Sequence, residues 1–196
     1  SPTVEPELSG YRATKTGQFK NRFLSGTMTA EYQVRYGEVF FTCFHAIKNG
    51  LEYLEMEYAG QAPTIGIIDG DSYYLVNHDQ KLVVTAPWDS GGAGLSNINA
   101  AFNIPEESEV NMEDFKTGSM DVDGRLCDTE EWLVNGEPVT LCFDGDELVR
   151  VIAVIGGYEQ ITTIHSISTE AADDALFVLP QDYQYIKLED LFAALE

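Results

Sequence analysis

Positively charged residues are scarce in this sequence. Its 196 residues include only 11 Lys and Arg against 33 Asp and Glu, which gives a formal net charge of −22. Nucleic acids and anionic membrane surfaces bind proteins chiefly through Lys and Arg, so neither is expected as a partner. The negative charge favours solubility and carries no information about the fold.

The sequence also lacks a long hydrophobic run and has few cysteines. No stretch of about 18 apolar residues is present, so no transmembrane helix is predicted. The cysteines are odd in number and form no disulfide framework: Cys43, Cys127 and Cys142. The last two flank a turn at Asn135-Gly136 and would lie diagonally on one face. Two alternatives stay open for them, a bridge after a register shift or buried free thiols.

Motifs for catalysis and metal binding are missing as well. Ser90-Gly91-Gly92 is not a nucleophile elbow, and Gly91 to Gly94 is not followed by the Lys-Ser or Lys-Thr of a phosphate loop. The three histidines show no ligand spacing. Asp-Gly clusters at 69–71, 121–124 and 144–146 lack a calcium-loop pattern and are typical of type I′ turns, whose two central residues take positive φ. We expect no enzyme, no metal and no cofactor.

What is present is a long series of short strands separated by tight turns. The stretch from Thr64 to Thr85 holds three apolar runs broken by turns at 69–71 and 77–80, which is the pattern of a β-meander. Further strands are predicted at 26–35, 38–48, 51–58, 119–122, 126–134, 137–143, 147–155 and 159–168. Roughly ten strands in sequence predict a mainly β (α+β) fold built on one highly curved antiparallel meander.

Four segments depart from the strand pattern. Residues 1–17 are polar and aperiodic, and we predict a tail or linker before a single domain over 18–196. Residues 86–117 are predicted to form a loop-helix insertion. At the end of the chain we predict a short helix at 169–175, capped by Ser168 or Thr169, and an amphipathic helix at 187–195.

The insertion is the natural place for a binding site. Its predicted helix, Leu95 to Phe102, would cover the concave face of the sheet, and long insertions of this kind often form lids or binding loops. A plain connection whose helix plugs one end of the sheet is the alternative. The candidate ligand-binding residues are apolar or aromatic and lie on the last meander strands or in the insertion: Tyr73, Leu75, Val83, Trp88, Leu95 and Phe102. For these aromatics, ordinary core packing is the competing interpretation.

Three segments resemble secreted lipoproteins with the lipoprotein-localisation (LolA-like) fold. They are F-L-S-G-T-M-T-A-E-Y from Phe23, V-T-L-C-F-D-G-D-E-L-V-R-V-I from Val139, and the closing Ile164–Ile186 segment with its Leu-Phe-x-x-Pro step. The resemblance implies an unclosed β-barrel wrapped around helices, often tethered to a membrane by an N-terminal lipid. It also implies an apolar ligand, a lipid or acyl chain, or a lipoprotein segment in the concave cavity. No individual ligand residue carries over, and the lipidated cysteine of a tether is absent from this sequence.

Together these features predict an extracytoplasmic, non-enzymatic binding protein. The start at Ser1-Pro2, without Met, is interpreted as the end left by removal of a signal peptide. The alternative function is a protein-interaction module whose cavity is plugged by its own helix and whose acidic face binds a basic protein partner. A hydrolase is disfavoured, because it would need a Ser-His or carboxylate pair in a polar cavity.

Overall fold

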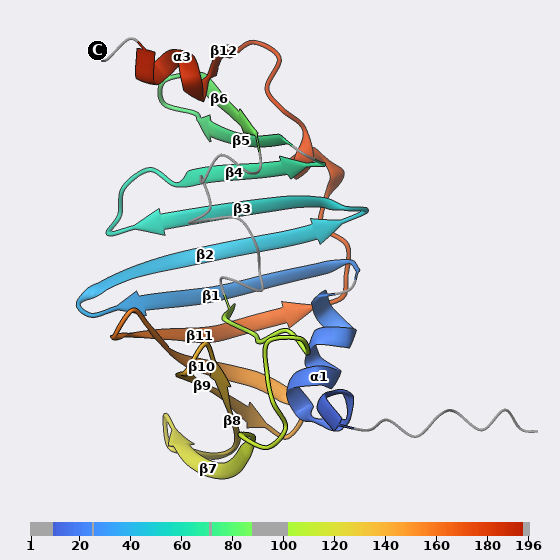
Figure 1. Ribbon diagram of the computed structural model, residues 1–196. Coiled ribbons are helices and arrows are strands. Elements are labelled where there is room, and N and C mark those ends of the chain that lie inside the picture. The colour runs from blue at the N-terminus through green and yellow to red at the C-terminus, as the bar shows by residue number, and fades with distance from the viewer. Residues whose placement is uncertain (1–9, 25, 71, 88–101, 194–196) are drawn as a thin grey trace, which may run out of the picture.

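The computed structural model describes residues 10–24, 26–70, 72–87 and 102–193, and its strands form one curved sheet (Figure 1). Across the sheet the order is β12-β6-β5-β4-β3-β2-β1-β11-β10-β9-β8-β7, so the two edges do not pair and the barrel is unclosed. The strands of the described residues are β1 (Met28–Tyr36), β2 (Val39–Lys48), β3 (Leu51–Tyr58), β4 (Thr64–Asp69), β5 (Ser72–Asn77), β6 (Leu82–Pro87), β7 (Lys116–Val122), β8 (Arg125–Val134), β9 (Glu137–Asp144), β10 (Glu147–Ile155), β11 (Tyr158–Ser168) and β12 (Gln184–Lys187).

The predicted fold class is confirmed, with one exception in strand direction. Neighbouring strands from β6 to β7 pair antiparallel, as sequential hairpins require. Strand β12 was not predicted, and it pairs in parallel with β6, Tyr185 lying opposite Val83. Its four residues carry too weak a period-two pattern to be recognised without the neighbouring strand.

The two faces of the sheet differ in what covers them. We call inner the face that carries Ala30, and the pairing register continues it across β2 to β6 through His45, Leu54, Gly66, Leu75 and Val84. The N-terminal helices and residues 102–115 pack on the inner side of β1 and β8–β11. On the outer face of β2–β6, apolar side chains of residues 172–183 pack instead.

The predicted tail is corrected for residues 10–17, which are folded. They form the 3-10 turn η1 (Gly10–Ala13) and the start of α1 (Lys15–Phe19), and the π-helical turn η2 (Lys20–Leu24) follows. Tyr11 is buried and donates a hydrogen bond to the Pro105 carbonyl oxygen at 2.6 Å. The sequence predicts a linker here because the segment is short and polar, and the two residues that pack in the core, Tyr11 and Phe19, are isolated aromatics that form no periodic pattern.

The C-terminal helices also differ from their predicted bounds. The helix expected at 169–175 is the 3-10 turn η3 (Asp174–Phe177), capped by Asp173, whose side chain accepts a hydrogen bond from the Ala175 N–H. The last helix, α3 (Leu188–Ala193), begins only after β12 ends. Pro180 and the extended residues around it separate the two helices, in keeping with the restriction proline places on its neighbours.

The φ angles of the turns agree with the predicted type I′ turn at some hairpins and not at others. Asn49-Gly50, Asp123-Gly124 and Asn135-Gly136 have positive φ at both residues, as type I′ turns need. At Asp144-Gly145-Asp146 only Gly145 has positive φ, so the I′ prediction is wrong there. Glycine as the first central residue is the signature of a type II′ turn instead.

Cys127 and Cys142 are free and buried, so the free-thiol alternative holds. Thr129 pairs with Cys142, which places the two thiols diagonally on adjacent strands in a small cluster with Val122 and Val149. Burial raises the pKa of the Cys142 thiol to about 11. Among the described residues, no group of His, Cys, Asp and Glu could hold a metal ion, and no helix is long and apolar enough to cross a membrane.

Candidate functional site on the inner face of the sheet

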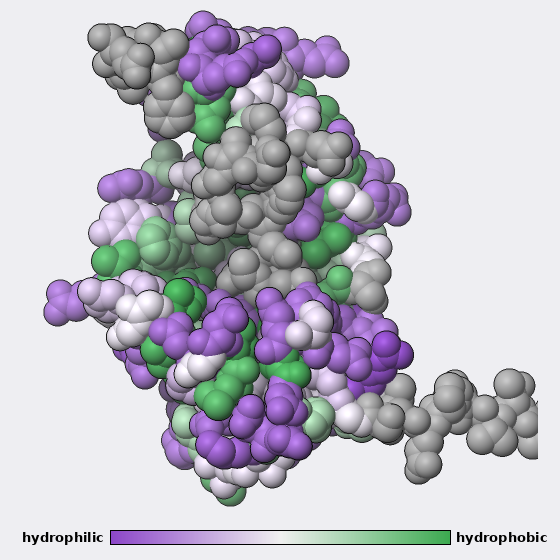
Figure 2. Space-filling view, in the orientation of Figure 1, coloured by the Kyte–Doolittle hydropathy of each residue, from purple (hydrophilic) through white to green (hydrophobic). Residues whose placement is uncertain are grey.

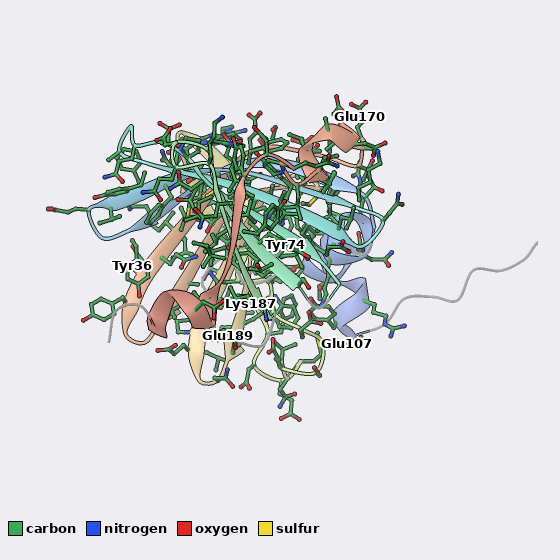
Figure 3. All side chains as sticks on the ribbon, turned by 90° about the horizontal axis from the view of Figure 1, so that it is seen from above. Tyr36, Tyr74, Glu107, Glu170, Lys187 and Glu189 are labelled. Atoms are coloured by element: carbon green, nitrogen blue, oxygen red, sulfur yellow. The ribbon has the colours of Figure 1, made fainter. Side chains whose placement is uncertain are left out.

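Among the described residues, several apolar side chains of the inner face are exposed at one end of its strands. Large hydrophobic side chains with inner-face register gather at the tips of the β1–β2 and β10–β11 hairpins and the end of β3: Tyr36, Val39, Tyr58, Ile155 and Tyr158. We call these five residues the rim. Tyr158 is 67% exposed, and its ring lies 6.0 Å from that of Tyr36. Seen from above, Tyr36 lies on one side of the molecule and Glu107 on the other (Figure 3).

Behind the rim, the inner face of β2–β6 is lined by hydrophobic and small residues. Phe41 packs on Tyr58 at 5.3 Å between ring centroids, and Met56, Leu75 and Val84 are each only partly buried. Figure 2 shows hydrophobic side chains gathered on this side of the molecule, at the height of the middle strands of Figure 1. At the described positions of this inner face neither Lys nor Arg occurs. The surface can therefore hold an apolar chain and offers no cation to an anionic one.

A histidine–carboxylate pair interrupts this apolar lining. His45, on β2, is 1% exposed, and its Nε2 lies 3.2 Å from Oε2 of Glu52 on β3. The period-two pattern of β3 places Glu52 on the same face as Leu54 and Met56, so its inward position can be read from the sequence.

Tyr73 contributes a second buried polar group to the same face. Its side chain lies across Gly66 of β4: a Cβ built on that glycine would stand 2.9 Å from the Tyr73 hydroxyl oxygen. Because Gly66 has no Cβ, the phenol ring of Tyr73 can approach the backbone of β4 at this position. Tyr73 is 3% exposed, and burial raises its pKa to about 12.

The residues predicted to bind ligand are divided between the two faces. Tyr73 and Leu75 share the inner face and lie in one cluster with Ile68 and Ala86. Phe102 is fully buried on the inner side, 4.8 Å from the ring of Tyr32. Val83 points to the outer face, where it packs with Tyr53 and Phe177, so it does not share a wall with Tyr73. Trp88 and Leu95 lie outside the described residues and stay predictions, as does the helix expected there.

Part of the inner face is covered by the protein's own side chains. Trp132 is fully buried against Phe115, with ring centroids 4.4 Å apart, and against Tyr11 at 5.3 Å. The N-terminal helices and residues 102–115 thereby fill the space above β8–β11. Cys43 of β2 and Leu54 of β3 are buried in this same cluster and Met56 packs against it, whereas Leu75 packs in a different one.

An open, curved sheet with helices on its inner face defines the class of unclosed β-barrels. No family model and no curated protein matches the sequence. Among solved structures, an uncharacterized conserved protein from Thermus thermophilus matches with a TM-score of 0.57 and 12% identity, over 88% of this chain and 97% of that chain. LprF from Mycobacterium bovis matches with a TM-score of 0.50 and 9% identity, over 81% and 93%.

The LolA superfamily protein NE2245 from Nitrosomonas europaea matches with a TM-score of 0.44 and 9% identity, over 82% of this chain and 93% of that chain. This chain shares its fold with the Thermus thermophilus protein and with LprF, and its unclosed β-barrel is what the resemblance of the three sequence segments implied. At these identities the likeness concerns the fold, and the function has to be argued from the inner face itself.

Proposed function

We propose that this protein is a non-enzymatic, extracytoplasmic binding protein that holds an apolar ligand, a lipid or acyl chain, on the inner face of β2–β6. The rim is the observation that carries the proposal. Soluble proteins rarely leave neighbouring large apolar side chains exposed unless they meet a ligand or partner there. The rim is continuous with the partly buried inner-face residues Phe41 and Met56, so it forms the entrance to a surface that suits an apolar chain.

Native mass spectrometry after mild purification is expected to show a co-bound lipid or acyl chain. A fluorescent fatty acid should also be taken up, with emission that shifts to the blue because the fluorophore leaves water. A mass equal to that of the protein without ligand, together with no uptake of the fluorescent fatty acid, would contradict the proposal.

Charge placed on the rim should reduce uptake without unfolding the protein. Tyr158→Glu puts a carboxylate where an apolar chain must pass, and we expect uptake of the fluorescent fatty acid to fall about tenfold, or about 1.4 kcal/mol. The melting temperature should stay within about 2 °C of the parent, since exposed positions contribute little to stability. Leu126→Glu is the matched control, because Leu126 is 77% exposed on β8, away from the rim. If uptake of the fluorescent fatty acid fell equally in the two variants, the rim would not be the place where the ligand enters.

A protein-interaction module is the second candidate. The filled space above β8–β11 and the net charge of −22 favour it, since a plugged cavity and an acidic surface together suit a cationic partner. Capture of a basic protein that is lost as salt rises, with no lipid retained, would support this function over the first.

A further inference from the structure

Two buried polar atoms on the inner face of β2–β6 have no hydrogen-bond partner within the part of the chain that the structure describes. They are Nδ1 of His45 and the hydroxyl oxygen of Tyr73. Their side chains are 1% and 3% exposed. Buried polar groups in folded proteins are nearly always bonded, and an orphaned one destabilises the protein that carries it. Two such atoms on one face of a candidate binding surface indicate that their partner is a ligand.

The sheet register brings these two atoms into one neighbourhood. His45, Leu54 and Gly66 are consecutive partners across β2, β3 and β4. The Tyr73 hydroxyl lies over Gly66, so it is in the same cross-strand row as His45. Two strand spacings separate the backbones at the ends of this row, about 10 Å. A polar head with more than one functional group can span such a row, whereas a single atom cannot.

The donors and acceptors that His45 and Tyr73 offer limit which functional groups the ligand's polar head can carry. When the Nε2–H of neutral His45 donates to Glu52, Nδ1 is left as an acceptor. The Tyr73 hydroxyl can donate or accept. Hydroxyl groups match both, because each supplies a donor for Nδ1 and an acceptor for the phenol. A carboxylate cannot satisfy Nδ1 in this state, since an ionised carboxylate has acceptors only.

The charges around this row of residues also favour a ligand head that is not an anion. Glu52 already places a carboxylate beside His45, and its side chain is 23% exposed. At the described inner-face positions of β2–β6 no Lys or Arg offsets it. A second negative charge on the ligand would be desolvated next to the first without compensation. An uncharged head avoids this cost.

We propose that His45 and Tyr73 bind the neutral, hydroxyl-bearing head of an amphiphile whose apolar tail occupies the inner face toward the rim. This inference rests on the proposed function and adds the class of ligand. Glu52 is a positioning residue, because it fixes the tautomer in which Nδ1 of His45 accepts. Fatty acids and anionic phospholipids are thereby disfavoured against uncharged polyol esters of the same tail.

The test compares two ligands with one tail and different heads on the full chain. Isothermal titration with 1-monolauroylglycerol and with laurate, both below their micellar concentrations, should show the glycerol ester bound about tenfold more tightly. Tyr73→Phe should reduce that preference to about threefold or less by weakening only the ester, and its melting temperature should not fall, because the lost hydroxyl had no protein partner.

Tyr53→Phe is the matched control. Tyr53, on β3, is 5% exposed and belongs to the outer face, and its hydroxyl donates to Glu55 at 2.7 Å. This variant should lose stability and keep the ligand preference. His45→Phe should act like Tyr73→Phe; if it does not fold, Tyr73→Phe alone decides.

Two results overturn the inference, and they differ in meaning. Equal binding of the two ligands to the parent chain, or an unchanged preference in Tyr73→Phe, rejects the polar head site and leaves the apolar-ligand function standing. Failure of both ligands to bind, with the fluorescent fatty acid also excluded, rejects the proposed function and the inference together.

Discussion

Replacement of Trp132 by alanine is expected to lower the free energy of unfolding by about 3–5 kcal/mol. The indole is fully buried between Tyr11 and Phe115, and its Nε1–H donates to the Thr16 hydroxyl oxygen at 3.1 Å. Truncation leaves a cavity where β8, the N-terminal helices and residues 102–115 meet. Because the indole joins all three, the variant should loosen their packing. Urea unfolding followed by circular dichroism measures the change.

Trp132→Phe separates packing from hydrogen bonding. It keeps most of the ring volume and loses the donor to Thr16, so a loss of about 1–2 kcal/mol is expected. A Trp132→Ala variant that unfolds within about 1 kcal/mol of the parent would show that the N-terminal helices are not held by this residue. The experiment also bears on function, since loosening these helices should expose the inner face of β8–β11 to apolar ligands.

The hairpin series could be predicted because its signals are local. Asn-Gly and Asp-Gly turns with period-two runs between them specify strands one at a time, and tight turns force sequential antiparallel pairing. Strand β12 was not predicted, because its pairing with β6 joins residues far apart in the sequence, as in Tyr185 with Val83. The short N-terminal helices were not predicted for the same reason. Tyr11 is anchored by the Pro105 carbonyl oxygen, a contact invisible to any local window.

The faces of the candidate residues were predicted less well than the fold, and the period-two alternation of side chains explains both the correct and the wrong assignments. Tyr73 and Leu75 are two residues apart and share a face, as alternation requires. Val83 was grouped with them although β5–β6 pairing sets it opposite Val76, on the outer face. The rim depends on three hairpin ends meeting at one side of a curved sheet, which only the register of β1, β2, β3, β10 and β11 reveals.

Replacement of Glu130 by glutamine is expected to destabilise the protein by about 3 kcal/mol, although the side chain barely changes size. Glu130 is 6% exposed, and its carboxylate accepts three hydrogen bonds. The donors are the backbone N–H groups of Lys15 and Thr16, at 2.8 Å each, and the Thr16 hydroxyl at 2.6 Å. An amide presents its own N–H groups where one oxygen had accepted, so at least one buried donor faces another donor.

Glu131→Gln is the matched control for this experiment, one residue along the same strand. Glu131 points the other way, its side chain is 36% exposed, and it pairs with Lys116 at 3.0 Å. Exposed pairs of this kind contribute about 0–1 kcal/mol, so Glu131→Gln should be nearly silent in urea unfolding. Equal effects of the two substitutions would mean that charge alone matters. A large loss of unfolding free energy only in Glu130→Gln would show that a buried carboxylate binds the start of α1 to β8. The same contact would then keep the N-terminal helices on the inner face of β8–β11.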